Sequence, residues 1–313
     1  MKLPGGGHMT SIYEQASAHI TKQSPLTPVI EAWNIYLNDQ DRSPYTIKAF
    51  IGDLQLLAKY LPPDKKVGDI TTNDINNFLN WLQHKRGVPC SAKSLARRIT
   101  SIKAFFRWLQ KNVVTDFDPA EKIVQKSVIS PLPTVLNPEE ENLILETAYK
   151  YRQQENPDAR PYTLLTLLLA TGIKKGECLA IKLNHIDNTS ASKPKLYVRY
   201  ANQRYRYKER NIDLTTDWIE SLNEYKEQYQ PTDTLFPWSP RRLEYLLEEI
   251  GEKAGISKHL SFDMCRWTSA LNDWRANIDH EKIRQKLGIS KIQFREISNK
   301  LKTLSTKIDT GAI

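Results

Sequence analysis

The chain has 313 residues, 40% hydrophobic and 26% charged, which is enough for about two domains with ordinary hydrophobic cores. These proportions exclude a chain that is disordered throughout, and the longest apolar run, 164–170, is too short to cross a bilayer, so no membrane partner is expected. The net charge of +9 and the pI of about 9.2 are unusual for enzymes of small metabolites and common among proteins that face phosphates.

Cysteine usage bears on cofactors and compartment. Cys90, Cys178 and Cys265 are widely separated and form no CxxC pair or Cys/His cluster. We therefore expect no metal, no disulfide framework and no other cofactor, and a reducing, cytoplasmic environment. Residues 1–9 are glycine-rich and end in a second methionine, so we interpret them as a cloning scar outside the fold.

The first part of the chain, 43–108, has a helical pattern throughout. A helix is expected from Ser43-Pro44 to Pro62-Pro63, with apolar residues at helical spacing on one face. A second helix is predicted from Thr71 or Thr72 to about Gly87, and a third from about Ser91 to Lys111.

The third predicted helix separates apolar from basic residues. Its apolar face carries Leu95, Ile99, Ile102, Phe106 and Leu109, and the opposite face carries Lys93, Arg97, Arg107 and Lys111. No acidic residue occurs between Ser91 and Thr115. Solvated faces usually mix both signs, and like charges at helical spacing repel unless an anion offsets them. The pattern therefore favours a phosphate-binding face over a merely solvated one.

Beyond this helix, the prolines between Asp116 and Pro138 indicate an extended linker. Further helices are expected over 139–151, 160–170, 240–254, 262–276, 281–287 and 291–301.

One β-hairpin is predicted, with strands over 195–200 and 205–214 around the turn 201–204. Aromatic and basic residues alternate along it. A cationic face toward DNA is favoured over an edge kept soluble by charge.

From about 27 to 304 the chain resembles the tyrosine recombinase (phage integrase) family. Residues 91–109 are close to the last DNA-contacting helix of that family's core-binding domain, and 132–141 resemble the entry to its catalytic domain. Residues 168–179 resemble the segment that bears the first catalytic arginine, and 235–237 precede the helix that leads to the second arginine.

The resemblance implies a mainly α fold with a small β-hairpin or sheet. A helical, SAM-like core-binding domain is expected over 24–118, a linker over 119–134 and a domain of the recombinase catalytic type over 135–304. Residues 305–313 are expected to be a tail. By the same resemblance, the two domains would clamp duplex DNA between them.

The family cleaves DNA with a tyrosine hydroxyl, which forms a 3′-phosphotyrosyl link. Two arginines hold the non-bridging oxygens, and a histidine pair (or His and Trp) and a hairpin lysine assist. Matching the motifs without gaps assigns these positions here to Lys174 (first arginine), Glu177 (retained acid), Lys208 (hairpin lysine, with Tyr205 as alternative), Asp263 (histidine), Arg266 (second arginine), Ile289 (His or Trp) and Ser298 (tyrosine).

Most of these assignments point away from cleavage. No tyrosine follows Tyr245, so a small shift in alignment restores none. Ser298 is an unfavourable substitute nucleophile because no base is evident beside it, and His259 is spaced poorly to replace the missing histidine.

We therefore expect a sequence-preferring protein that binds double-stranded DNA without cleaving it and acts in, or derives from, recombination or integration. The alternative is an active recombinase with an atypical or partner-supplied nucleophile. Expected partners are DNA and, in an oligomer, a second copy or an active recombinase. A further alternative is that the basic faces bind another polyanion, such as structured RNA, or a protein partner. The expected DNA contacts are Lys48, Lys93, Arg97, Arg98, Arg107, Lys111, Lys174, Arg199, Arg206, Lys208, Arg210 and Arg266.

Overall fold

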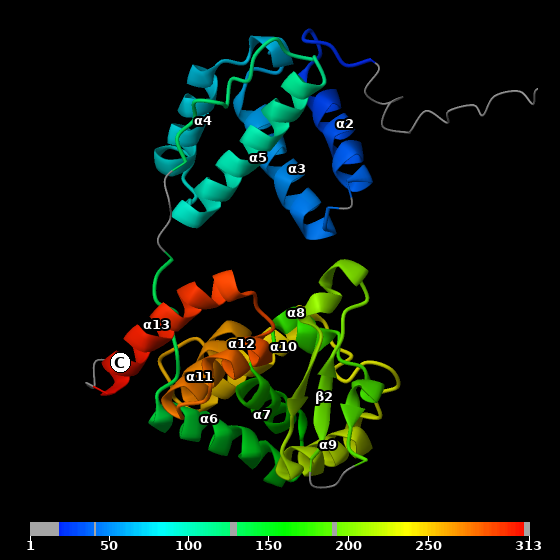
Figure 1. Cartoon of the computed structure of the whole chain (residues 1–313), viewed down its shortest axis with the longest axis vertical. Coiled ribbons are helices and arrows are strands. Elements are labelled where there is room, and N and C mark those ends of the chain that lie inside the picture. The colour runs from blue at the N-terminus through cyan, green and yellow to red at the C-terminus, as the bar shows by residue number, and fades with distance from the viewer. Residues whose placement is uncertain (1–18, 41, 126–129, 190–192, 310–313) are drawn as a thin grey trace, which may run out of the picture. The chain divides into compact units, whose positions relative to one another are not determined.

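The computed structural model describes residues 19–40, 42–125, 130–189 and 193–309 (Figure 1). The chain divides into two compact units between Ser130 and Pro131. Residues 1–9, interpreted as a cloning scar, lie outside the described residues.

The N-terminal unit is a helical domain. Its elements are α2 (Leu26–Asp39), α3 (Pro44–Tyr60), the 3₁₀ turn η1 (Val67–Asp69), α4 (Thr72–His84) and α5 (Ala92–Lys111). The side chains of Ser43, Thr71 and Ser91 cap α3, α4 and α5 by accepting hydrogen bonds from backbone N–H groups. The three helices predicted in this region are confirmed.

The core of this unit is aromatic. Trp33, Phe78, Phe105 and Phe106 are fully buried, and the Trp33 ring meets Phe105 edge-on with 5.3 Å between centroids. The sequence prediction omits α2. Pro28 lies in the first turn of this helix, where a proline is tolerated, so it does not argue against a helix here.

The predicted linker begins too early. Ala120 and Ile123 are buried in the core of the N-terminal unit, so this part of the proline-rich segment packs rather than connects. At the other end, Val135 and Leu136 are buried in cores of the C-terminal unit.

The C-terminal unit surrounds α7, which is apolar on all sides and packs against four other helices. Its helices are α6 (Pro138–Lys150), α7 (Arg160–Thr171), α8 (Lys175–Leu179), α9 (Thr216–Tyr229), α10 (Pro240–Lys253), α11 (Phe262–Arg275), α12 (His280–Leu287) and α13 (Lys291–Asp309), with 3₁₀ turns η2 (Tyr151–Gln153), η3 (Leu183–His185) and η4 (Gln203–Lys208).

A small antiparallel sheet in the order β1-β2-β3 completes this unit. Its strands are β1 (Ile186–Asp187), β2 (Lys195–Val198) and β3 (Arg210–Asp213). The predicted hairpin exists, since β2 pairs with β3 and Val198 lies opposite Arg210. The prediction of strand for 205–208 is wrong, because these residues form η4. β1 was not predicted.

The last helix belongs to the folded unit. α13 continues through Asp309, so residues 305–309 are helix rather than tail; 310–313 lie outside the described residues. Leu301 and Leu304 of α13 are buried beside Val135 and residues of α11 and α12. The mainly α architecture with a small sheet is confirmed. Across the described residues, every helix falls short of the length and apolarity needed to cross a membrane.

Candidate nucleic-acid interface

Arg266 on α11 connects the ends of two other helices. Its Nη1 donates to the carbonyl of Gly172, the residue that terminates α7. Its Nη2 donates, at 2.8 Å, to the carbonyl of Leu287, the last residue of α12. Carbonyls at helix C-termini carry partial negative charge and favour a cation. Burial lowers the pKa of Arg266 to about 10, opposed by the charge of Glu177, so the guanidinium stays protonated at neutral pH.

Lys174 lies beside this arginine. Gly172 leaves α7 in the left-handed conformation with φ 58°. Two residues later Lys174 is the N-cap of α8, and its backbone N–H donates to Glu177 Oε2 at 2.9 Å. Burial and the nearby Arg266 charge lower the pKa of Lys174. Lys174, Asp263 and Arg266 line one pocket of about 900 Å³.

Glu177 is buried and paired with Arg210 of β3. Arg210 Nη1 and Nη2 donate to Glu177 Oε1 and Oε2 at 3.1 and 2.9 Å, and only 8% and 3% of the two side chains are exposed. Burial by itself raises the pKa of Glu177, but the hydrogen bonds and charge of Arg210 lower it to about 2. Arg210 therefore does not lie on the exposed cationic face that the hairpin pattern predicted.

Gly288, directly after α12, leaves room for the Arg210–Glu177 ion pair. Arg210 Nε donates to the Lys286 carbonyl at 2.6 Å. Gly288 has φ 59°, and a Cβ added there would lie 2.5 Å from Arg210 Nη1. A residue with a side chain at Gly288 would thus be strained and would displace the guanidinium.

Tyr200 completes the surroundings of Glu177, and sequence reasoning missed it. Its hydroxyl donates to Glu177 Oε1, and burial followed by the Glu177 carboxylate raises the pKa of Tyr200. Its place at the end of the predicted strand 195–200 is the only signal that the sequence offers for it.

The hairpin loop carries the next group of cations. Lys208 Nζ lies 4.8 Å from the centroid of the Tyr205 ring and 5.3 Å from that of Tyr207, within cation–π range. Arg199 and Arg206 are exposed and line a separate pocket of about 520 Å³.

The three remaining positions assigned by the resemblance have different surroundings. Asp263 is exposed at the pocket beside Arg266. Ile289 is 7% exposed and packs in the core with α13, so it faces away from solvent. Ser298 lies within α13 and its Oγ donates to the Arg295 carbonyl at 3.0 Å. His259 is exposed, with Nδ1 3.6 Å from Glu248 Oε1.

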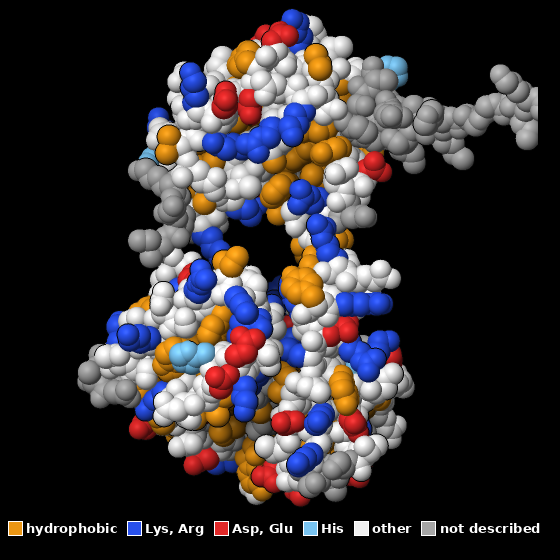
Figure 2. Space-filling model, in the orientation of Figure 1, with side chains coloured by type: hydrophobic (Ala, Val, Ile, Leu, Met, Phe, Trp, Pro, Cys, Tyr) orange, Lys and Arg blue, Asp and Glu red, His pale blue; other side chains and the backbone are white. Residues whose placement is uncertain are grey.

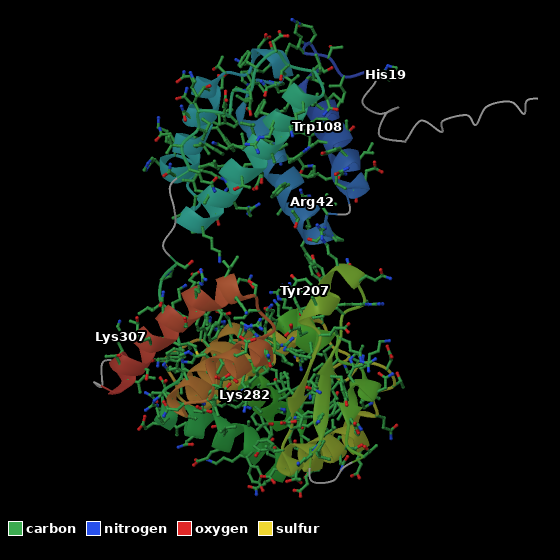
Figure 3. All side chains as sticks on the ribbon, in the orientation of Figure 1. His19, Arg42, Trp108, Tyr207, Lys282 and Lys307 are labelled. Carbon is green, nitrogen blue, oxygen red and sulfur yellow. The ribbon has the colours of Figure 1, made fainter. Side chains whose placement is uncertain are left out.

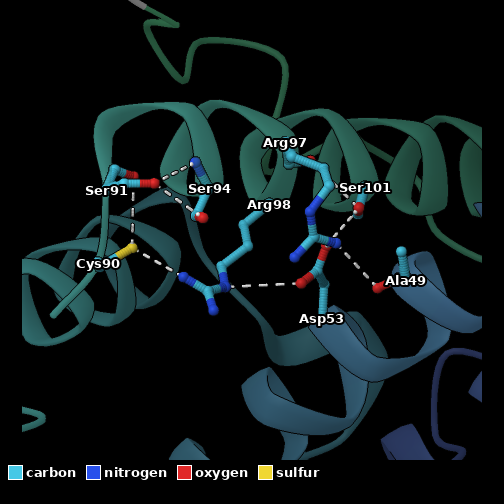
Figure 4. A network of polar contacts seen from close by, with 8 residues as sticks. All are labelled: Ala49, Asp53, Cys90, Ser91, Ser94, Arg97, Arg98 and Ser101. Atoms are coloured by element: carbon cyan, nitrogen blue, oxygen red, sulfur yellow. Dashed lines mark hydrogen bonds and ion pairs between the residues drawn. The ribbon is translucent and has the colours of Figure 1, made fainter. Parts of the chain in front are cut away.

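A second basic surface follows α5 of the N-terminal unit, where Lys and Arg side chains lie over the helix (Figure 2). Lys93, Arg107 and Lys111 of α5 and Lys48 of α3 are exposed. Arg97 is half-exposed: its side chain is 40% accessible, while Nη1 donates to Asp53 Oδ2 and to the Ala49 carbonyl at 3.1 Å (Figure 4).

Arg98 points toward the interior, unlike the exposed contact expected from the sequence. Only 14% of its side chain is accessible; Nη1 donates to Cys90 Sγ at 2.7 Å and Nε lies 3.5 Å from Asp53 Oδ1 (Figure 4). Asp53 is 3% exposed and also accepts from Ser101 Oγ at 2.8 Å. Burial raises the pKa of Asp53, opposed by Ser101 and the two arginines. This cluster joins α3 to α5.

Metal ligands are sparse. In the described part of the chain, no group of three or more His, Cys, Asp or Glu side chains is arranged to hold a metal ion. Cys90, Cys178 and Cys265 are all free thiols.

Comparison with known families decides the classification. Residues 134–297, more than half of the chain, match the family model described as the phage integrase family. The chain belongs to the phage integrase family. Residues 30–112 match the phage integrase N-terminal SAM-like domain, so both halves of this family's architecture are present.

Relatives and solved structures agree with this family. A tyrosine recombinase XerC from Oceanobacillus iheyensis is 24% identical over 274 residues, covering 83% of this chain and 86% of the relative. A tyrosine recombinase from Pseudothermotoga lettingae is 24% identical over 272 residues, covering 84% and 90%.

Two DNA-bound structures share the fold. XerH site-specific recombinase bound to a palindromic difH substrate aligns with TM-score 0.68 and 18% identity, covering 91% of this chain and 83% of that one. A lambda integrase dimer bound to a COC′ core site aligns with TM-score 0.67 and 16% identity, covering 93% and 81%.

Proposed function

We propose that this chain binds double-stranded DNA on a tyrosine recombinase scaffold and does not cleave it. The membership in the phage integrase family supports DNA as the ligand, and the net charge of +9 agrees with it. The similar structures are of XerH bound to a palindromic difH substrate and of lambda integrase bound to a COC′ core site.

Exposed and partly buried cations on both units would contact the phosphates. Arg98 and Arg210 are left out of the proposed contacts because their guanidinium groups are buried against Asp53 and Glu177, where each stabilises the fold of its own unit. The proposed phosphate contacts are Lys48, Lys93, the exposed part of Arg97, Arg107, Lys111, Lys174, Arg199, Arg206, Lys208 and Arg266.

The surroundings of Ser298 carry the proposal that cleavage is absent. Where the family has its tyrosine, this chain has a hydroxyl that donates to a carbonyl of its own helix. Hydrogen bonding to that carbonyl does nothing to activate the oxygen, because a carbonyl is a poor general base. At the other positions, Ile289 is in the core and Asp263 adds a negative charge to the pocket where phosphate would bind.

The experiment is duplex binding as a function of salt. A protein with about six to ten phosphate contacts loses roughly 10³- to 10⁵-fold in affinity between about 50 and 200 mM salt. We expect a fall of this size on a preferred sequence and on unrelated duplexes. Near-constant affinity over this range, or preference for RNA of equal length, would count against duplex DNA as the ligand.

We extend the proposal to assembly on DNA. Solved structures described as a lambda integrase dimer on a core site and as a tetramer on a Holliday junction are similar to this chain. This chain would accordingly associate with a second copy or with an active recombinase on adjacent sites. Sedimentation of the chain with DNA that carries one or two sites measures how many protein copies bind each DNA molecule. A single bound copy on both DNAs, with and without an active recombinase, would contradict this assembly.

A further inference from the structure

Tyr207 is an exposed aromatic residue in a basic loop. It belongs to η4 between β2 and β3, lies at the tip of the hairpin (Figure 3), and 74% of it is accessible. Arg204 and Arg206, in the same turn, are exposed as well. An exposed aromatic ring beside exposed cations is a combination that binds planar groups linked to phosphates.

The loop is ordered by its own hydrogen bonds. Asn202 Oδ1 accepts from the Arg204 N–H at 2.9 Å, and the Asn202 carbonyl accepts from the Tyr205 N–H at 3.0 Å. At the other end, the Glu209 N–H donates to the Arg206 carbonyl at 2.9 Å. The tip is therefore preorganised, which reduces the entropy lost when a ligand binds.

A series of ring contacts connects Tyr207 to the buried acid of the site. Lys208 Nζ lies between the Tyr207 and Tyr205 rings, at 5.3 and 4.8 Å from their centroids. The Tyr205 ring centroid is 6.1 Å from that of Tyr200, whose hydroxyl donates to Glu177. Tyr207 thus has cation–π support and still exposes most of its surface.

We propose that Tyr207 is a stacking site for an unstacked nucleobase, with Arg204 and Arg206 on the adjacent phosphates. A base inside an intact duplex is covered on both faces, so it offers no surface to a tyrosine ring, whereas an unpaired base does. The flanking cations favour a nucleic acid over an apolar protein partner. The inference rests on the proposed DNA binding and adds to it a preference for DNA that carries an unpaired base.

Two DNA probes test this: a fully paired duplex, and the same duplex with one extra, unpaired 2-aminopurine. The variants are Tyr207→Ala and Tyr207→Phe, with Tyr149→Ala as matched control, because Tyr149 is an exposed tyrosine of α6 outside the loop. We expect Tyr207→Ala to bind the unpaired probe about 5- to 150-fold more weakly than the unchanged chain does, with little change on the paired duplex.

The other variants and the fluorescence complete the test. Tyr207→Phe keeps the ring and should keep the preference, and Tyr149→Ala should resemble the unchanged chain. The 2-aminopurine fluorescence should fall on binding of the unchanged chain and not of Tyr207→Ala. If Tyr207→Ala loses the same affinity for both probes, or loses none, the stacking site is overturned while the proposed DNA binding stands. Failure of the unchanged chain to bind either probe overturns the proposed function itself.

Discussion

Replacing Arg210 by methionine tests whether this residue holds the fold rather than DNA. The substitution leaves the Glu177 carboxylate buried, with 3% of its side chain exposed and without its bidentate partner. Removing one member of a buried ion pair costs about 3–5 kcal/mol. Consistent with this, the Arg210 contacts, with the hydrogen bonds from Tyr200 and the Lys174 N–H, outweigh the effect of burial and lower the pKa of Glu177 to about 2.

The effect of Arg210→Met should depend on pH in a defined direction. Because the folded pKa of Glu177 is depressed, its stabilising contribution is fully present above the ordinary value of 4.5 and is lost as the pH falls toward about 2. The difference in unfolding free energy between the unchanged chain and Arg210→Met should therefore shrink over that window. Urea unfolding followed by circular dichroism at pH 7 and at pH values down to about 3 measures it.

A surface ion pair of the same unit provides the control. Lys175 Nζ lies 2.7 Å from Glu244 Oε1, and both side chains are nearly half exposed, so Lys175→Met should cost less than about 1 kcal/mol. Combining Arg210→Met with Glu177→Gln removes the unpaired charge and should recover stability. The reasoning is refuted if Arg210→Met costs no more than Lys175→Met, or if the double variant is as unstable as Arg210→Met.

Three further predictions concern other residues. Lys93→Ala should weaken duplex binding by a similar factor on all sequences and reduce the slope of log affinity against log salt by about 1; an unchanged slope contradicts the phosphate contact. Gly288→Ala should destabilise the chain by more than Gly255→Ala in thermal unfolding, because both glycines have positive φ but only Gly288 lacks space for a Cβ; equal losses would refute this. Asp53→Asn should lower the free energy of unfolding in urea by less than Glu177→Gln does. Burial raises the pKa of Asp53, whereas Arg210 lowers that of Glu177, so the fold favours the charged form of Glu177 more; the reverse order would contradict this.

Much of the fold is local in origin and was therefore predictable. Helices with a side-chain cap and one apolar face, such as α5, were found because both signals lie within the helix itself. α9 carries the same signals, a Thr215 cap and the buried residues Trp218, Leu222 and Tyr225, so this helix too is predictable from its sequence, although the sequence prediction omits it.

The surroundings of the basic residues depend on contacts distant in sequence. The charge pattern of α5 does not reveal that Arg98 meets Asp53 on another helix, or that Arg210 of β3 meets Glu177. A helical projection separates a basic face from an apolar one but identifies no partner. Motif order assigned Lys174, Glu177 and Arg266 to one site, and the structure brings them together.

The most direct test of the central claim is a nicked suicide substrate, from which a recombinase cannot religate its covalent intermediate. The chain and a relative that retains its tyrosine are incubated with the same DNA design, and protein–DNA adducts are resolved under denaturing conditions. We expect saturated binding by this chain with no adduct, including for Ser298→Tyr, because Lys174, Asp263 and Ile289 still differ from the family site. A covalent adduct formed by the unchanged chain, mapped to any of its residues, would show that this chain cleaves DNA.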